Sequence, residues 1–223
     1  MSGNGFRPPI TLHGRYLDLE PLERVHAAGL AEAGRDPEVW QYLRIGPGHP
    51  PTSEEMGAFI DQLLVLQTDG ELLPLTMVLL PERTLVGIIR FLDIDRPNRS
   101  VEVGTWIDSH YWRSPLNTEA KLLTLGYAFE VEGVHRLQMK TDARNVRSQV
   151  AVERLGAVPE GALREAHLVH GGYFRTSLYY SILAPEWPGV KRHLEERLSR
   201  PWEKRPAPTD RATAAGTSPS ASP

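Results

Sequence analysis

The segment from Glu102 to Ala120 has the residue pattern of a strand, a loop and the beginning of a helix. Such a junction suits an anion, because the first N–H groups of a helix have no carbonyl partner and the helix dipole is positive there. Asn117 or Thr118 is expected to cap this helix, since both residue types favour the capping position. An ordinary capped helix without a ligand has the same pattern, so the junction by itself leaves both interpretations open.

Basic residues are concentrated just downstream of this junction. Between His135 and Arg154, five lysine or arginine residues stand against Asp142 and Glu153, so the segment carries +3 in a chain whose net charge is −3. The five basic residues are Arg136, Lys140, Arg144, Arg147 and Arg154. A small polyphosphate ligand would explain this distribution, and a solvent-exposed basic helix face is the alternative.

The sequence lacks the residues that several other kinds of site require. It contains no P-loop, no dinucleotide-binding glycine pattern, no hydrolase nucleophile elbow and no HExxH motif. The absence of cysteine excludes disulfides, thiolate metal sites and a cysteine nucleophile, and it fits a cytoplasmic protein. His167 and His170 have no carboxylate at ligand spacing, so we expect no metal. The acidic balance argues against DNA as a partner, and no apolar run has the length of a membrane span.

Hydrophobic periodicity and turn signals predict one α+β domain over residues 1–200, followed by a disordered tail at 201–223 that is rich in Pro, Ala, Ser and Thr. Seven strands are expected, at Ile10–Leu19, Leu72–Leu80, Leu85–Asp93, Val101–Ile107, Arg136–Thr141, Gly161–Val169 and Tyr173–Leu183. Helices are expected at Glu23–Ala33, Glu38–Leu43, Thr118–Val131 and Asn145–Leu155, and a last one from Pro188 onward. A further helix is expected to begin at Thr52, because Thr52 and Glu55 have the spacing of a capping box.

The order of these elements constrains the sheet. Three consecutive strands form an antiparallel meander that ends at Val101–Ile107, and a helix then leads to the strand Arg136–Thr141. A strand, helix and strand in this order make the two strands parallel through a right-handed crossover. We therefore expect a mostly antiparallel sheet with one parallel step, at the junction where the anion site was inferred.

Three runs of the sequence carry a family resemblance: EVGTWIDSHYW, NTEAKLLTLGYAFE, and HRLQMKTDARNVRSQVAVERLGA. Residues 10–200 resemble the GNAT superfamily of N-acetyltransferases, in the branch that contains the ribosomal-protein N-terminal (Rim-type) enzymes. The resemblance implies helices on both faces of the sheet. It also implies transfer of an acetyl group from acetyl-CoA to a primary amine, either a protein N-terminal α-amine or a small-molecule amine, by direct attack in a ternary complex.

The family's pyrophosphate loop follows the pattern [QR]-x-x-G-x-[GA], which falls on Trp112–Asn117. Pro115 and Asn117 stand where the family has small residues, so one backbone donor is lost and bulk is added near the phosphates. A CoA-binding regulatory module with weak catalysis is the alternative that this departure motivates. The resemblance implies that the cofactor is bound by Trp106, Ile107, Arg113, Ser114, Leu116, Asn117, Thr118, Asn145 and Arg147.

Two residues are candidates for proton transfer. An α-amine, with a pKa of about 7.7–8.0, needs less help from a base than a lysine near 10.4. Glu102 is the candidate base, directly or through water, and a solvated surface glutamate is the alternative. Ser148 is the candidate proton donor to the leaving thiolate, and a hydroxyl that bonds the helix backbone is the alternative.

The expected partners are acetyl-CoA and an amine acceptor, and a homodimer is left open. Backbone N–H groups at Trp106 and Ile107 are expected to polarise the thioester carbonyl. A factor that associates with RNA or the ribosome through the basic segment is a third alternative, which salt-dependent binding would reveal.

Overall fold

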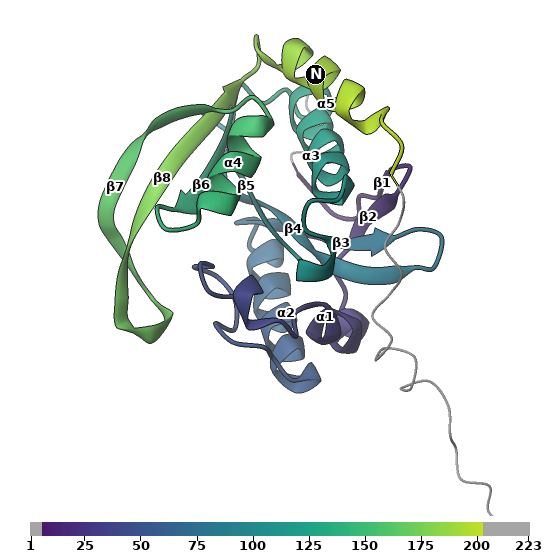
Figure 1. The fold of residues 1–223 in the computed structure, drawn as a ribbon, viewed down its shortest axis with the longest axis vertical. Coiled ribbons are helices and arrows are strands. Elements are labelled where there is room, and N and C mark those ends of the chain that lie inside the picture. The colour runs from purple at the N-terminus through teal and green to yellow at the C-terminus, as the bar shows by residue number, and fades with distance from the viewer. Residues whose placement is uncertain (1–5, 203–223) are drawn as a thin grey trace, which may run out of the picture.

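The computed structural model describes residues 6–202 (Figure 1). Its sheet has eight strands in the order β1-β2-β3-β4-β5-β6-β8-β7. The strands are β1 Leu12–His13, β2 Leu17–Pro21, β3 Leu73–Leu79, β4 Thr84–Asp95, β5 Ser100–Ile107, β6 Arg136–Asp142, β7 Val158–Val169 and β8 Tyr173–Leu183. The α-helices are α1 Ala27–Ala33, α2 Ser53–Thr68, α3 Leu116–Gly126, α4 Val146–Arg154 and α5 Trp187–Leu198.

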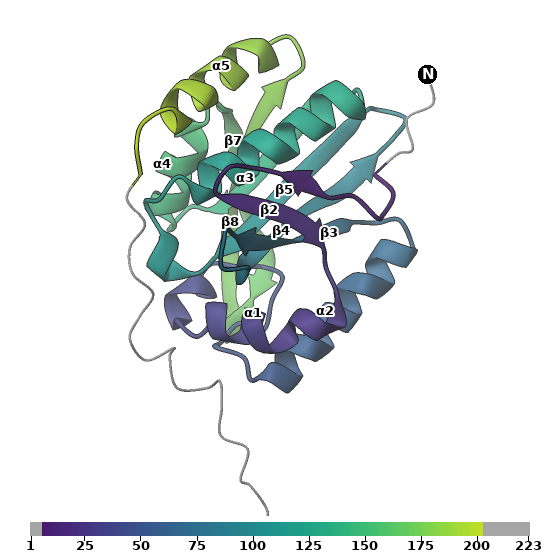
Figure 2. The same ribbon diagram turned by 90° about the vertical axis from the view of Figure 1, so that its right-hand side faces the viewer.

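The expected sheet architecture is confirmed. Strands β3, β4 and β5 form the antiparallel meander, and β5 pairs with β6 in parallel. Helices α1 and α2 cover one face of the sheet, and α3, α4 and α5 cover the other (Figure 2). The capping box of α2 is also present, since Thr52 Oγ1 accepts the N–H of Glu55 at 3.2 Å and the Thr52 N–H donates to Glu55 Oε2 at 2.8 Å.

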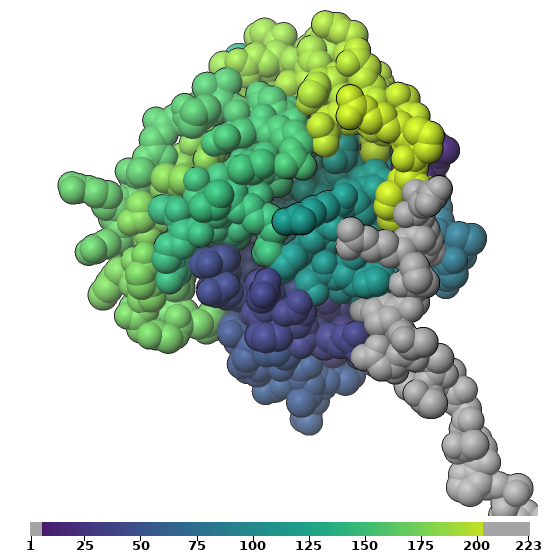
Figure 3. Space-filling model, viewed as in Figure 1, coloured from purple at the N-terminus to yellow at the C-terminus, as the bar shows by residue number. Residues whose placement is uncertain are grey.

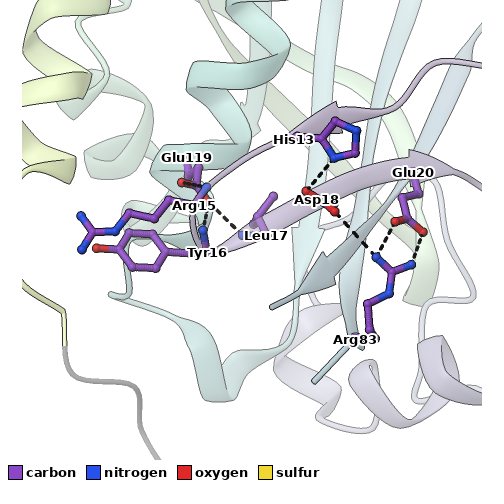
Figure 4. Close-up of polar contacts among 8 residues, drawn as sticks. All are labelled: His13, Arg15, Tyr16, Leu17, Asp18, Glu20, Arg83 and Glu119. Carbon is purple, nitrogen blue, oxygen red and sulfur yellow. Dashed lines mark hydrogen bonds and ion pairs between the residues drawn. The ribbon is translucent and has the colours of Figure 1, made fainter. Parts of the chain in front are cut away.

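The predicted number of strands was one too low. The segment Ile10–Leu19, expected as one strand, forms the short antiparallel pair β1 and β2 with a turn between them. The carboxylate of Glu119, on α3, accepts the N–H groups of Arg15, Tyr16 and Leu17 at 2.8–2.9 Å (Figure 4). These three amides therefore bond to a distant side chain instead of a neighbouring strand, which interrupts the predicted strand at the turn.

Two helix predictions also need correction. The short helix expected at Glu38–Leu43 is only a 3-10 turn, Pro37–Val39. Helix α3 begins at Leu116, with Pro115 at its N-cap, so the prediction that Asn117 or Thr118 caps it was wrong. Proline is compatible with this position because the first N–H groups of a helix have no internal partner. The helix ends at Gly126 and continues as a π-helical turn.

The predicted tail lies mostly outside the described residues, because only Pro201 and Trp202 of 201–223 are described. The ring of Trp202 packs edge-on against Tyr16, with the ring centres 5.3 Å apart. Within residues 6–202, no helix combines the length and apolarity that crossing a membrane requires.

Candidate functional site

The parallel step of the sheet is short, and its two strands separate. Pairing between β5 and β6 runs from Ser100 with Arg136 to Glu102 with Gln138 and then stops, although both strands continue. A cavity of about 400 Å³ lies between the separated strands and the N-terminal ends of α3 and α4. The surface is hollowed between these two helices (Figure 3).

Backbone N–H groups of β5 face this gap. The Asp108 N–H donates to Val86 O on β4 at 2.8 Å, and amide directions alternate along a strand. The N–H of Trp106 therefore points toward β4, and those of Thr105 and Ile107 point toward the gap. The carbonyl of Trp106 approaches Gly87 on β4 too closely for a Cβ at that position, which agrees with this assignment. Of the two amides singled out from the sequence, that of Ile107 thus points toward the gap and that of Trp106 does not; the neighbouring amide that does is that of Thr105.

The N-terminus of α3 supplies donors at another edge of the cavity. The first helical bond is donated by the Glu119 N–H to Pro115 O at 2.9 Å, so the amides of Asn117 and Thr118 have no carbonyl in the helix. Both residues line the cavity.

The other two predicted donors of this loop are already engaged. The Ser114 N–H donates to Tyr111 O at 3.2 Å, and the Leu116 N–H lies 3.3 Å from Ser114 Oγ. The side chain of Leu116 is fully buried in the core and does not line the cavity, whereas Ser114 and Arg113 do.

The start of α4 forms the opposite wall, with Asn145, Arg147 and Ser148. Asn145 is the N-cap of this helix, since its Oδ1 accepts the N–H of Ser148 at 3.0 Å. The side-chain NH2 of Asn145 takes no part in this cap bond. The guanidinium of Arg147 stacks on Trp112, 3.1 Å from the ring centre, and thereby joins the start of α4 to the loop before α3.

Only part of the predicted basic segment belongs to the site. Lys140, Arg147 and Arg154 line the cavity, together with Arg113 and with Arg197 of α5. Arg136 is instead paired with Glu160, and Arg144 with Asp142. Three basic residues of the segment thus line the cavity, and two others form ion pairs outside its lining.

Glu102, the candidate base, does not line the cavity. It is buried beside it, and its Oε2 lies 2.5 Å from the Nζ of Lys140, which does line the cavity. Burial raises the pKa of Glu102, and the hydrogen bond with Lys140 opposes that shift. Lys140 also pairs with Asp93 at 2.9 Å. The carboxylate is thus held next to the cavity by a lysine that the sequence did not mark as its partner.

Lys121 is a further residue of the cavity wall that the sequence analysis missed. It lies on α3 four residues after Asn117, a spacing that places both on one face of the helix and could have indicated it. Its side chain is buried, and its Nζ donates to Thr105 Oγ1 at 2.6 Å.

Comparison with known proteins gives a consistent result. Residues 17–158 match the family described as acetyltransferase (GNAT) domain. The chain is 33% identical over 113 residues to YdaF of Bacillus subtilis (strain 168), a provisionally named ribosomal N-acetyltransferase; the match covers 51% of this chain and 61% of YdaF. It is 30% identical over 103 residues to the ribosomal-protein-serine acetyltransferase of Escherichia coli (strain K12), covering 46% and 57%. The chain thus spans less than two thirds of the length of either relative.

Solved structures share the fold over most of the chain. A provisionally named acetyltransferase from T. thermophilus is 39% identical, with a TM-score of 0.78 and coverage of 86% of this chain and 98% of that one. Mycobacterium smegmatis RimJ in complex with CoA-disulfide has a TM-score of 0.75 at 19% identity, with coverage of 85% and 95%, which shows a common fold.

Proposed function

The chain belongs to the GNAT family of acetyltransferases, and we propose that it transfers the acetyl group of acetyl-CoA to a primary amine by direct attack in a ternary complex. The observation that carries this proposal is the cavity at the parallel step. It places backbone donors of a separated strand and the donors of a helix N-terminus along one continuous space. An elongated cofactor with phosphates at one end and amide and thioester carbonyls along its arm fits this arrangement.

Different hydrogen-bond donors of the cavity wall suit different parts of the cofactor. The amides of Asn117 and Thr118, with Arg113, suit the pyrophosphate, because charged and backbone donors together bind phosphate strongly. The gap-facing amides of Thr105 and Ile107 suit carbonyls of the arm, including the thioester. The NH2 of Asn145 suits a pantetheine carbonyl on the facing wall.

The proposed reaction forms one bond and breaks one. The neutral acceptor amine attacks the thioester carbon, the C–N bond forms, and the C–S bond then breaks to release CoA. Glu102 takes the proton that the amine loses, directly or through a water, because burial raises the pKa of this carboxyl and so makes it a stronger base than an ordinary glutamate. The hydroxyl of Ser148, on the opposite wall, donates a hydrogen bond to the leaving sulfur.

We propose a protein N-terminal α-amine as the acceptor. Two relatives named for ribosomal-protein acetylation support this choice. An α-amine also needs little base strength, which agrees with a single buried carboxylate held in an ion pair.

A CoA-binding regulatory module with weak catalysis is the alternative function. It was motivated by Pro115 and Asn117, but Pro115 occupies an N-cap where its missing N–H costs no helical bond. The amides of Asn117 and Thr118 have no carbonyl partner in the helix, and both residues line the cavity, so two backbone donors are left for the phosphates.

A release assay tests the proposal directly. Purified protein is incubated with acetyl-CoA and a panel of amines that includes N-terminal peptides of ribosomal proteins, the same peptides with blocked N-termini, and small amines. Free thiol and the mass of each amine are measured. We expect thiol release with a free N-terminal peptide, matched by addition of one acetyl group. Binding of acetyl-CoA by calorimetry with no turnover on any amine would favour the regulatory alternative.

A further inference from the structure

Lys121 has an unusual place for a lysine. Only 5% of its surface is exposed, yet it forms part of the cavity wall. It lies one helical turn inward from Asn117 and Thr118, and its Nζ is anchored at 2.6 Å to Thr105 Oγ1. Thr105 supplies one of the two gap-facing amides proposed for the thioester. The ammonium group therefore lies beside a residue of β5 whose amide is proposed to meet a carbonyl of the cofactor arm.

Lys121 and Glu102 lie on opposite faces of β5. Val101, Val103 and Ile107 belong to the core that includes α3, whereas Trp106 belongs to the core that includes α1 and α2. Side chains alternate along a strand, so Thr105 and its partner Lys121 are on the α3 face and Glu102 is on the other. A proton can thus be removed from the acceptor on one side of the strand and supplied to the leaving group on the other.

The charge of Lys121 has no counter-ion in direct contact. Among residues 6–202, Glu102 is the one charged group that acts on it, and no ion pair of Lys121 is formed. Burial lowers the pKa of Lys121 to about 7, and the charge of Glu102 opposes this. The other charged groups of the cavity wall are all cations, namely Arg113, Lys140, Arg147, Arg154 and Arg197. An anion that forms in the cavity would therefore meet an ammonium group that has no counter-ion and gives up its proton easily.

The reaction has a use for such a donor. When the C–S bond breaks, the electron pair stays on sulfur and the thiolate must take up a proton. Ser148 can stabilise the thiolate by a hydrogen bond, but a serine hydroxyl is far too weak an acid to be left as an alkoxide. Helix α4, which forms the opposite wall, offers no tyrosine, histidine, cysteine or lysine that could give a proton to sulfur, since Val146–Arg154 contains none.

We propose that Lys121 is the proton donor to the departing CoA thiolate. This inference rests on the proposed acetyl transfer. The ammonium of Lys121 gives one proton to sulfur as the C–S bond breaks, CoA leaves as the thiol, and the neutral amine of Lys121 regains a proton from solvent once the cavity opens. The proton lost by the acceptor amine goes to Glu102 and from there to solvent. In each turnover the protein thus releases one proton through Glu102 and takes up one at Lys121.

The first test needs no acceptor. The thiol pKa of CoA bound to the protein is measured from the ultraviolet absorbance of the thiolate, in wild type, Lys121→Met and Lys121→Arg. A cation beside a thiol lowers its pKa, so Lys121→Met is expected to raise the pKa of bound CoA by about one unit, and Lys121→Arg is expected to keep it low. Lys191→Met, which removes an exposed lysine of α5, is the matched control and is expected to change nothing.

The second test separates charge from proton transfer. Both Lys121 variants are expected to lower kcat about 10²-fold with a small change in the KM for acetyl-CoA, because arginine keeps the charge but does not release its proton. Circular dichroism checks that each variant is folded. Unchanged thiol pKa and kcat in a folded Lys121→Met, alongside an active wild type, would overturn the role of Lys121 alone. A wild type that binds no CoA would overturn the proposed function as well.

Discussion

The cap of helix α4 allows the folding role of Asn145 to be separated from its proposed binding role. Its Oδ1 accepts the Ser148 N–H at 3.0 Å, while its NH2 is available to the cavity. Asn145→Ala removes both groups, and the lost cap is expected to lower the free energy of unfolding by about 1 kcal/mol. Asn145→Asp keeps an oxygen for the cap and removes only the NH2, so its stability is expected to stay within about 0.5 kcal/mol of wild type.

The two variants are therefore expected to agree in binding and to differ in stability. A neutral hydrogen bond to a pantetheine carbonyl is worth about 1 kcal/mol, which corresponds to roughly a fivefold increase in Kd for acetyl-CoA in Asn145→Ala. Asn145→Asp is expected to lose at least as much, because a carboxylate oxygen facing a carbonyl repels it. Urea unfolding without cofactor gives the stability, and isothermal calorimetry gives the Kd.

A control at a different helix cap tests whether stability alone changes binding. Thr52→Ala removes the cap of α2, which does not belong to the cavity lining, and should cost a similar free energy of unfolding without changing the Kd for acetyl-CoA. Asn145→Asp with the affinity of wild type would refute the assignment of the NH2 group to the cofactor. A loss of affinity in Thr52→Ala equal to that in Asn145→Ala would show that the binding effect is indirect.

Three further predictions concern stability. Glu119→Ala removes the acceptor of three backbone N–H groups, one of them on the buried Leu17. It is expected to lower the free energy of unfolding, measured by urea denaturation, by about 3 kcal/mol or more. A loss below about 1 kcal/mol would contradict this role of the carboxylate. Truncation after Trp202 removes a segment with few apolar residues and is expected to leave the Tm and the acetyl-CoA affinity unchanged. A shorter chain that lacks Trp202 also loses the ring contact with Tyr16 and should have a lower Tm. Lys121→Met is expected to stabilise the free protein most at and below pH 7. Burial lowers the pKa of Lys121 to about 7, from about 10.4 in the unfolded chain, so the cost of burying its charge is complete below pH 7 and disappears as the pH rises toward 10. A gain in unfolding free energy that is independent of pH between 6 and 9 would argue that the buried amine titrates normally.

The local sequence was sufficient for most of the order of the elements and for the parallel step of the sheet. The capping box at Thr52 and Glu55 and the hairpin of β7 and β8 depend on residues close together in the chain, and both were predicted correctly. The change from hairpins to a crossover helix likewise predicted the parallel step, which is where the cavity lies. The cap of α4 at Asn145, inferred as the start of that helix, was also found.

The errors share a physical cause. Glu119 interrupts the first predicted strand through hydrogen bonds to residues 102–104 positions away, a separation that no local pattern can reveal. The cap of α3 was misplaced because Asn117 and Thr118 are good capping residues in isolation, whereas the loop before the helix already supplies Ser114 to the first amide.

The sequence by itself thus determined the family resemblance, the antiparallel meander with its parallel step, and the start of α4 at Asn145. The tertiary structure decided which of the candidates act on the cavity. It paired Glu102 with Lys140, directed the amide of Thr105 and not that of Trp106 into the gap, and buried Lys121 beside it. Strand and helix propensities are local, but the pKa of a buried group and the direction of an amide depend on which distant segments surround it, and only folding brings those segments together.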